Sequence, residues 1–300
     1  MAWSTAPLSR SEVESLTNVW RARGLIPVLV AVAAAFAAWA LLLPVVPTAV
    51  IDAQQPASLA GLSTGVFMLA TVITQIFTPK ALKTIGYRWV MAISSLLLGI
   101  PALGYMIGMG ATPLLTVSAI RGIGFGALSV AEAAIIAELV PLRLLGSATG
   151  IFGVVVGLAQ MVALPSGLAL VQMIGYDAVY MIATAIGAVS LVACLAIPTI
   201  PPPEPDTETS QSVRVPMWHL ALVPALALMF VTTAYGAITN FLPVSMRELD
   251  PVSGAALAGV MLGVLNFAAM ISRYIAGRIM DRRGYPGTVL IPFQITAAIG

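Results

Sequence analysis

Apolar residues come in blocks of about twenty along nearly the whole chain, a length that crosses the hydrocarbon core of a bilayer as a helix. The chain is 59% hydrophobic and 9% charged, with a mean hydropathy of +1.00, whereas about 25% of the residues of a soluble domain are charged. So few charges do not cover a water-soluble surface, and we predict an all-α membrane protein. The predicted spans are residues 25–46, 57–77, 89–109, 113–139, 146–173, 178–197, 218–244 and 255–275, and a ninth block runs from 288 to 300.

The basic residues gather in alternate loops. Positive residues in short loops stay on the cytoplasmic side of a membrane, so we predict a multi-pass protein of the cell membrane with residues 1–23 in the cytoplasm. Only Arg247 falls in the opposite set of loops. The predicted cytoplasmic set is Arg10, Arg21, Arg23, Lys80, Lys83, Arg88, Arg143, Arg214, Arg273, Arg278, Arg282 and Arg283.

A polar, proline-rich stretch at 199–216 separates two parts of the chain, and its composition favours an extended, solvated linker. Residues 24–198 form a predicted six-helix bundle, and 217–300 form part of a second bundle, with helices seven, eight and the start of nine. Residues 57–87 align without gaps on 255–285, including the Gly-Tyr pairs at Gly86 and Gly284. Because this offset spans six helices, both copies have the same orientation, as in carriers built from two parallel repeats.

The end of the eighth span carries a specific motif. Gly277-Arg278-Ile279-Met280-Asp281-Arg282-Arg283-Gly284 resembles the G-x-x-x-D-R-x-G signature of the major facilitator superfamily. The first-half copy departs from the signature, with Lys83 at the position of the Asp. The resemblance implies twelve helices in two halves that rock around a central site, so we expect the second half to be incomplete within these 300 residues. It also implies that Asp281 contacts the start of the fifth span near Gly146.

Two charged residues lie inside the fourth predicted span. Arg121 precedes Gly122, Gly124 and Gly126, and is similar to the family's fourth-helix arginine, with compressed spacing. An arginine inside a span costs about 2.5–3.5 kcal/mol on insertion scales and usually faces a bundle interior or watery cavity. Glu132 follows eleven positions later, close to the same helical face. Both are candidates for solute binding or proton coupling, and a structural charge satisfied by backbone carbonyls is the alternative.

Uncharged polar residues within the spans are further candidates for solute contacts. Thr232, Tyr235 and Thr239 lie three to four residues apart and share a helix face, although threonine hydroxyls often bond their own helix. The complete set of additional candidates is Gln160, Thr232, Tyr235, Thr239, Asn240 and Asn266.

Glycines four residues apart recur along the chain. They predict faces where helix backbones pack closely. The pairs are Gly61/Gly65, Gly122/Gly126, Gly146/Gly150, Gly153/Gly157 and Gly259/Gly263.

The resemblance implies a secondary transporter of a small solute, with the proton as an open coupling partner. The family's export signature in the fifth helix is half present, with Gly153 and Gly157 but a proline delayed to Pro165, so the direction of transport stays open.

A non-transporting membrane protein, either a sensor or an inactive truncated transporter, is the alternative. One histidine and no H-E-x-x-H motif give no basis for an enzyme. We expect no cofactor, no metal and no nucleic-acid partner. The lipid bilayer is the expected surrounding of the protein.

Overall fold

The computed structural model describes residues 6–200, 222, 226, 229–230 and 254–283. Residues 6–200 and 270–283 belong to one compact unit, whereas 254–269 belong to a second. The contacts reported below all lie inside the first unit. Its regular elements are helices, and no strand occurs among the residues described, as the sequence predicts.

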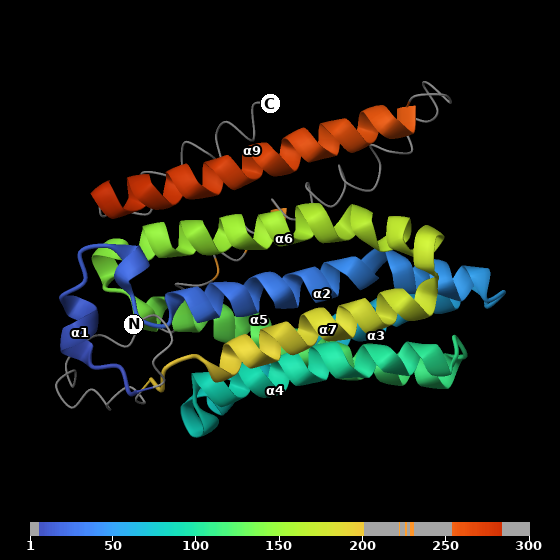
Figure 1. Ribbon diagram of the computed structural model, residues 1–300, viewed down its shortest axis with the longest axis horizontal. Helices are drawn as coiled ribbons and strands as arrows, with labels where there is room; N and C mark the ends of the chain where they lie inside the picture. Colours follow the sequence, from blue (N-terminus) through green and yellow to red (C-terminus); the bar gives the residue numbers. More distant parts are fainter. Residues whose placement is uncertain (1–5, 201–221, 223–225, 227–228, 231–253, 284–300) are drawn as a thin grey trace. The chain divides into compact units, whose positions relative to one another are not determined.

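Six helical segments long and apolar enough to cross a membrane follow one another in the first unit (Figure 1). A short 3-10 helix, η3 (Leu142–Leu144), leads into α6, and a longer one, η2 (Ile100–Ile107), continues α4. The other bounds are α2 Leu25–Asp52, α3 Ala57–Ile85, α4 Tyr87–Gly99, α5 Ala111–Leu139, α6 Leu145–Ile174 and α7 Tyr176–Leu195.

All six predicted spans before the linker are confirmed as helices, and most ends agree within two residues. The two larger differences occur where a proline lies inside the helix. We predicted that the first span ends at residue 46 and the second at 77, but α2 continues past Pro47 to Asp52 and α3 continues past Pro79. Transmembrane helices tolerate proline, although Pro47 leaves the Leu43 carbonyl without its helical N–H donor. The Thr48 hydroxyl adds a bond to the next carbonyl along the chain, that of Pro44, at 2.8 Å.

Single glycines make the tightest connections in the bundle. Gly86 joins α3 to α4 with φ 86°, and Gly175 joins α6 to α7 with φ 82°. Side chains with a Cβ rarely adopt this left-handed backbone. Each turn therefore reverses the chain within one residue and sets consecutive helices antiparallel.

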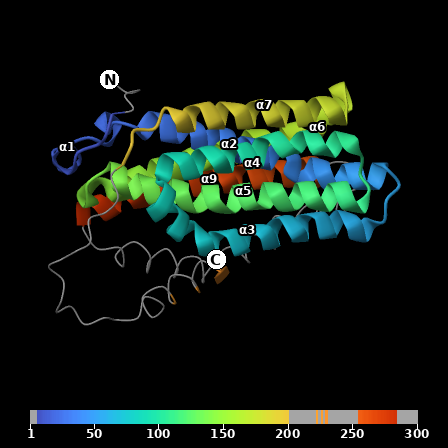
Figure 2. The same ribbon diagram turned by 90° about the horizontal axis from the view of Figure 1, so that it is seen from below.

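The bundle is organised around α2 and α5. α2 packs against α6 and α7, while α5 packs against α3 and α4 (Figure 2). Gly122 and Gly126 of α5 face the backbone of α3 at Phe67 and Thr71, so the predicted packing face is confirmed there. By contrast, a Cβ at Gly61 or Gly65 would meet nothing within 4 Å, so that pair makes no close contact.

A short N-terminal segment, residues 6–24, folds onto one end of the bundle. It contains α1 (Arg10–Glu14) and η1 (Val19–Arg21), which are capped by the side chains of Ser9 and Asn18. Arg143, between α5 and α6, donates to the carbonyl oxygens of Glu14 and Leu16, each at 2.6 Å. These bonds tie the segment to the bundle.

The predicted eighth span is confirmed as part of a long helix, α9 (Gly254–Arg283). The predicted seventh span and the ninth block lie outside the described residues, apart from isolated positions of the seventh. The last part of α9, from Met270 onward, lies against α6, with Gly277 and Gly146 in backbone contact. The Gly146/Gly150 pair is therefore a close-packing face, as predicted.

Candidate functional site

Arg121 lies on α5, four residues before the midpoint of the helix, and is 3% exposed. Its Nε donates to the carbonyl oxygen of Leu98 at 3.0 Å, and Nη2 donates to that of Ala38 at 3.4 Å. Nη1 donates to the Tyr105 hydroxyl at 3.5 Å, and the guanidinium carbon lies 5.6 Å from the centre of the Tyr105 ring. The arginine is thus anchored to α2, α4 and η2 through neutral oxygens.

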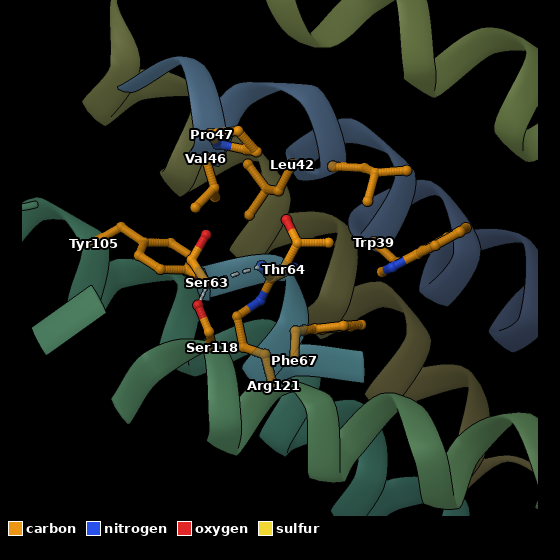
Figure 3. Close-up of a pocket in the computed structure, with 11 residues that line it drawn as sticks. Trp39, Leu42, Val46, Pro47, Ser63, Thr64, Phe67, Tyr105, Ser118 and Arg121 are labelled. Carbon is orange, nitrogen blue, oxygen red and sulfur yellow. Dashed lines mark hydrogen bonds between the residues drawn. The ribbon is translucent and has the colours of Figure 1, made fainter. Parts of the chain in front are cut away.

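Arg121 lines a small cavity of about 30 Å³ between α2, α3, η2 and α5 (Figure 3). Such a volume holds one or two water molecules. The Tyr105 hydroxyl contacts the guanidinium, and the Tyr105 and Ser118 oxygens lie 3.1 Å apart. The lining residues are Trp39, Leu42, Leu43, Val46, Pro47, Ser63, Thr64, Phe67, Tyr105, Ser118 and Arg121.

Trp39 contributes an indole to the same cavity. Its ring stacks on Phe125 with the centroids 4.8 Å apart, which fixes its orientation. The indole nitrogen is buried and has no hydrogen-bond partner among the residues that the structure describes, and Figure 3 shows it on the cavity side of the ring. An indole N–H can only donate, so the cavity wall carries a donor that lacks an acceptor.

Glu132 occupies a different environment, although it lies on the same helix. It is 0% exposed, and within the described part of the chain neither carboxyl oxygen has a hydrogen-bond partner. Eleven residues separate it from Arg121, about 16 Å along the helix axis, and the two form no ion pair. Glu132 is also absent from the lining of the cavity. The structure therefore does not bring the two predicted charges into one site.

A polar group lies close to Glu132 inside the bundle. The Ser95 hydroxyl of α4 lies 2.9 Å from that of Ser190 and 3.4 Å from Cys194 Sγ, both on α7. Ser190 also donates to the carbonyl oxygen of Ala31 at 2.9 Å. These side chains satisfy one another and leave the Glu132 carboxyl unpartnered.

The other candidate residues are scattered or undescribed. Gln160 is half-buried on α6, and no hydrogen bond connects it to Arg121 or Glu132. Asn266 lies on α9, but its side chain is outside the described part of the structure. Thr232, Tyr235, Thr239, Asn240 and Gly284 also lie outside it.

The loop motif forms the contact predicted for it. The two carboxylate oxygens of Asp281 accept hydrogen bonds from the backbone nitrogens of Gly146 and Ser147, each at 2.6 Å. These nitrogens belong to the first turn of α6, where backbone N–H groups lack partners and the helix dipole favours an anion. Gly277 is buried against α6, whereas the Arg282 side chain is exposed.

A much larger cavity, of about 650 Å³, lies between α2, α6 and α7. Its wall is apolar except for Ser166, whose hydroxyl donates to the carbonyl oxygen of Val162. It therefore offers no charged or free polar group for recognition. The cavity at Arg121 is the better candidate site.

Sequence reasoning found Arg121 but missed its surroundings, chiefly Trp39, Tyr105, Ser63 and Ser118. One signal was available, because Trp39 is a donor-bearing aromatic in the middle of the first span, away from the interfaces where tryptophan is usual. The hydroxyl residues gave no comparable signal.

Comparisons with known proteins agree with this architecture. The family model described as Major Facilitator Superfamily matches residues 28–300. A search of curated proteins found no match. The crystal structure of the human organic anion transporter MFSD10 (TETRAN) is similar to this chain, with a TM-score of 0.63 and 16% identity over 88% of this chain and 73% of that one. The proton:xylose symporter XylE bound to 6-bromo-6-deoxy-D-glucose matches with a TM-score of 0.42 and 13% identity, over 88% of this chain and 55% of the symporter. The chain belongs to the Major Facilitator Superfamily of membrane transporters.

Proposed function

We propose that this protein moves a small solute across the cell membrane by alternating access, with its N-terminus in the cytoplasm. In this mechanism two helix bundles rock against each other around a site near the midplane. The bond between Asp281 and the start of α6 carries the proposal, because it joins a helix after the linker to a helix of the first bundle. A contact of this kind can form in one orientation of the bundles and break in the other.

Arg121 supports a solute site at membrane depth. It lies about 6 Å along the axis from the midpoint of α5, from four residues at 1.5 Å each. Charged residues at such depth are expensive and commonly mark substrate or ion pathways. The cavity beside it is lined by both hydroxyl groups and aromatic rings.

Glu132 is the residue that we propose for proton coupling. A buried carboxylate without a partner is costly, whereas the protonated carboxyl group is neutral. A change in access that exposes Glu132 to water would allow it to release a proton, so the carboxyl group could link proton movement to the bundle motion. Arg121 and Glu132 would then have separate tasks.

Transport in reconstituted vesicles tests the proposed function. Purified protein is placed in liposomes, and uptake and efflux of a panel of labelled small solutes are followed with and without an imposed proton gradient. We expect saturable exchange of at least one solute, and accumulation that depends on the gradient. Protein that is folded by circular dichroism but exchanges no solute under either condition would favour the alternative of a non-transporting membrane protein.

A further inference from the structure

We propose that the cavity at Arg121 binds the anionic head of the solute, and that the head is a carboxylate. The inference rests on the transport function proposed above and specifies the chemical class of its substrate. It depends on three observations: an uncompensated charge, unused N–H donors and the size of the cavity.

The charge of Arg121 is not neutralised by any acid in the described residues. A guanidinium keeps its charge in proteins, and all three of its hydrogen-bond partners are neutral oxygens. The acid of the same span, Glu132, is about 16 Å away along the helix. A buried cation without a counter-ion attracts an anion strongly, because the surrounding dielectric is low.

The Arg121 guanidinium carries N–H groups that no acceptor in the described residues uses. A guanidinium carries five N–H groups, and three of them are used, one on Nε and one on each terminal nitrogen. One N–H on Nη1 and one on Nη2 remain. Arginine commonly binds both oxygens of a carboxylate with N–H groups of two of its nitrogens.

Trp39 adds a further donor to the wall. Its buried indole N–H has no partner and lies on the cavity side of the ring (Figure 3). A buried donor without an acceptor costs about 1–3 kcal/mol. A ligand rich in acceptors removes that cost, whereas an ammonium head would bring more donors and a second positive charge.

The size of the cavity limits the ligand to a compact head. About 30 Å³ accommodates a group of one or two water-sized oxygens, so the body of the solute must lie outside the cavity. A carboxylate is planar, compact and accepts only. These properties favour an organic monocarboxylate as the solute.

The test measures ligand binding by purified protein as the shift of its thermal unfolding midpoint in detergent. The probes are acetate, lactate and benzoate, each paired with its neutral amide of the same shape, and choline as a cation. We expect at least one carboxylate to raise the midpoint while its amide does not. A ligand that binds only the folded state stabilises it by RT ln(1 + [L]/Kd), so titration of the shift gives the affinity.

Variants assign the effect to the cavity. Arg121→Gln should weaken carboxylate binding about tenfold or more, because hydrogen bonds to charged groups are strong. Arg121→Lys should retain the preference for carboxylate over amide at reduced affinity, since it keeps the charge but loses the fork. Trp39→Phe should lower the affinity a fewfold. The exposed Arg10 supplies the matched control, and Arg10→Gln should bind like the unaltered protein.

The inference is overturned if amides stabilise the protein as well as carboxylates do, if only choline stabilises it, or if no carboxylate does. It is also overturned if folded Arg121→Gln keeps the full shift. Exchange of a neutral solute in vesicles, without carboxylate binding, would leave the proposed transport function standing. Carboxylate binding without exchange of any solute would contradict the transport function alone.

Discussion

An oxygen of the Asp281 carboxylate lies 2.6 Å from the backbone nitrogen of Gly146. This bond joins α9, which follows the linker, to α6, which precedes it. The second carboxylate oxygen binds Ser147 at the same distance. One acid therefore satisfies two of the free N–H groups that begin every α-helix.

Replacing the carboxylate by an amide tests this bond. Asp281→Asn removes the charge and one acceptor, so we expect a loss of about 1–2 kcal/mol in the free energy of unfolding and slower transport. Thermal unfolding in detergent and vesicle exchange measure the two effects. Asp177→Asn, at an exposed acid in the first turn of α7, is the control. Equal behaviour of the two variants would show that the Asp281 bond contributes nothing.

A methyl group at Gly146 should separate α6 from α9. The added Cβ would overlap the Gly277 carbonyl oxygen and approach Asp281 Oδ1 to 2.6 Å. Overpacking of this kind costs about 1–3 kcal/mol, so Gly146→Ala should lower the unfolding midpoint. Gly65→Ala is the matched control, since its Cβ would meet nothing within 4 Å and alanine favours helix by up to about 1 kcal/mol. A Gly146→Ala variant as stable as Gly65→Ala would contradict the close contact.

If Glu132 couples transport to protons, its replacement should affect accumulation driven by a proton gradient but not solute exchange at equilibrium. Glu132→Gln keeps the size of the side chain but cannot exchange a proton. We expect it to retain solute exchange at equilibrium and to lose accumulation driven by a proton gradient. Glu138→Gln, at the end of the same helix, should keep both. Gradient-driven accumulation by Glu132→Gln at the normal level would rule out this role.

Arg143 should hold the N-terminal segment against the bundle. Its Nη2 donates to the carbonyl oxygens of both Glu14 and Leu16, and Leu8 N donates to Thr199 O at 3.0 Å. We expect Arg143→Gln to increase the rate at which a protease cleaves residues 6–24, because that sequence opens locally more often. Arg10→Gln, on the segment itself, serves as the comparison. Unchanged cleavage of Arg143→Gln would show that the other contacts are sufficient.

The sequence alone determined the six helices before the linker, because the length of an apolar block is a local property. The span at 113–139 differs from α5 by two residues at one end. The resemblance of residues 277–284 to the family motif also predicted the bond of Asp281 to the start of α6. The continuation of α2 beyond Pro47 escaped prediction, because proline ends most helices in water, whereas a packed transmembrane helix tolerates it.

Only the tertiary structure decided which side chains surround Arg121. Trp39, Ser63, Tyr105 and Ser118 come from four separate segments, and no pattern within one segment encodes their meeting. It also placed Arg121 beside a cavity and Glu132 in a closed interior, although the two share a helix and, by periodicity, nearly a face. Charge and periodicity fix where a residue lies along its helix, whereas the packing of neighbouring helices decides whether it meets a cavity or a closed interior.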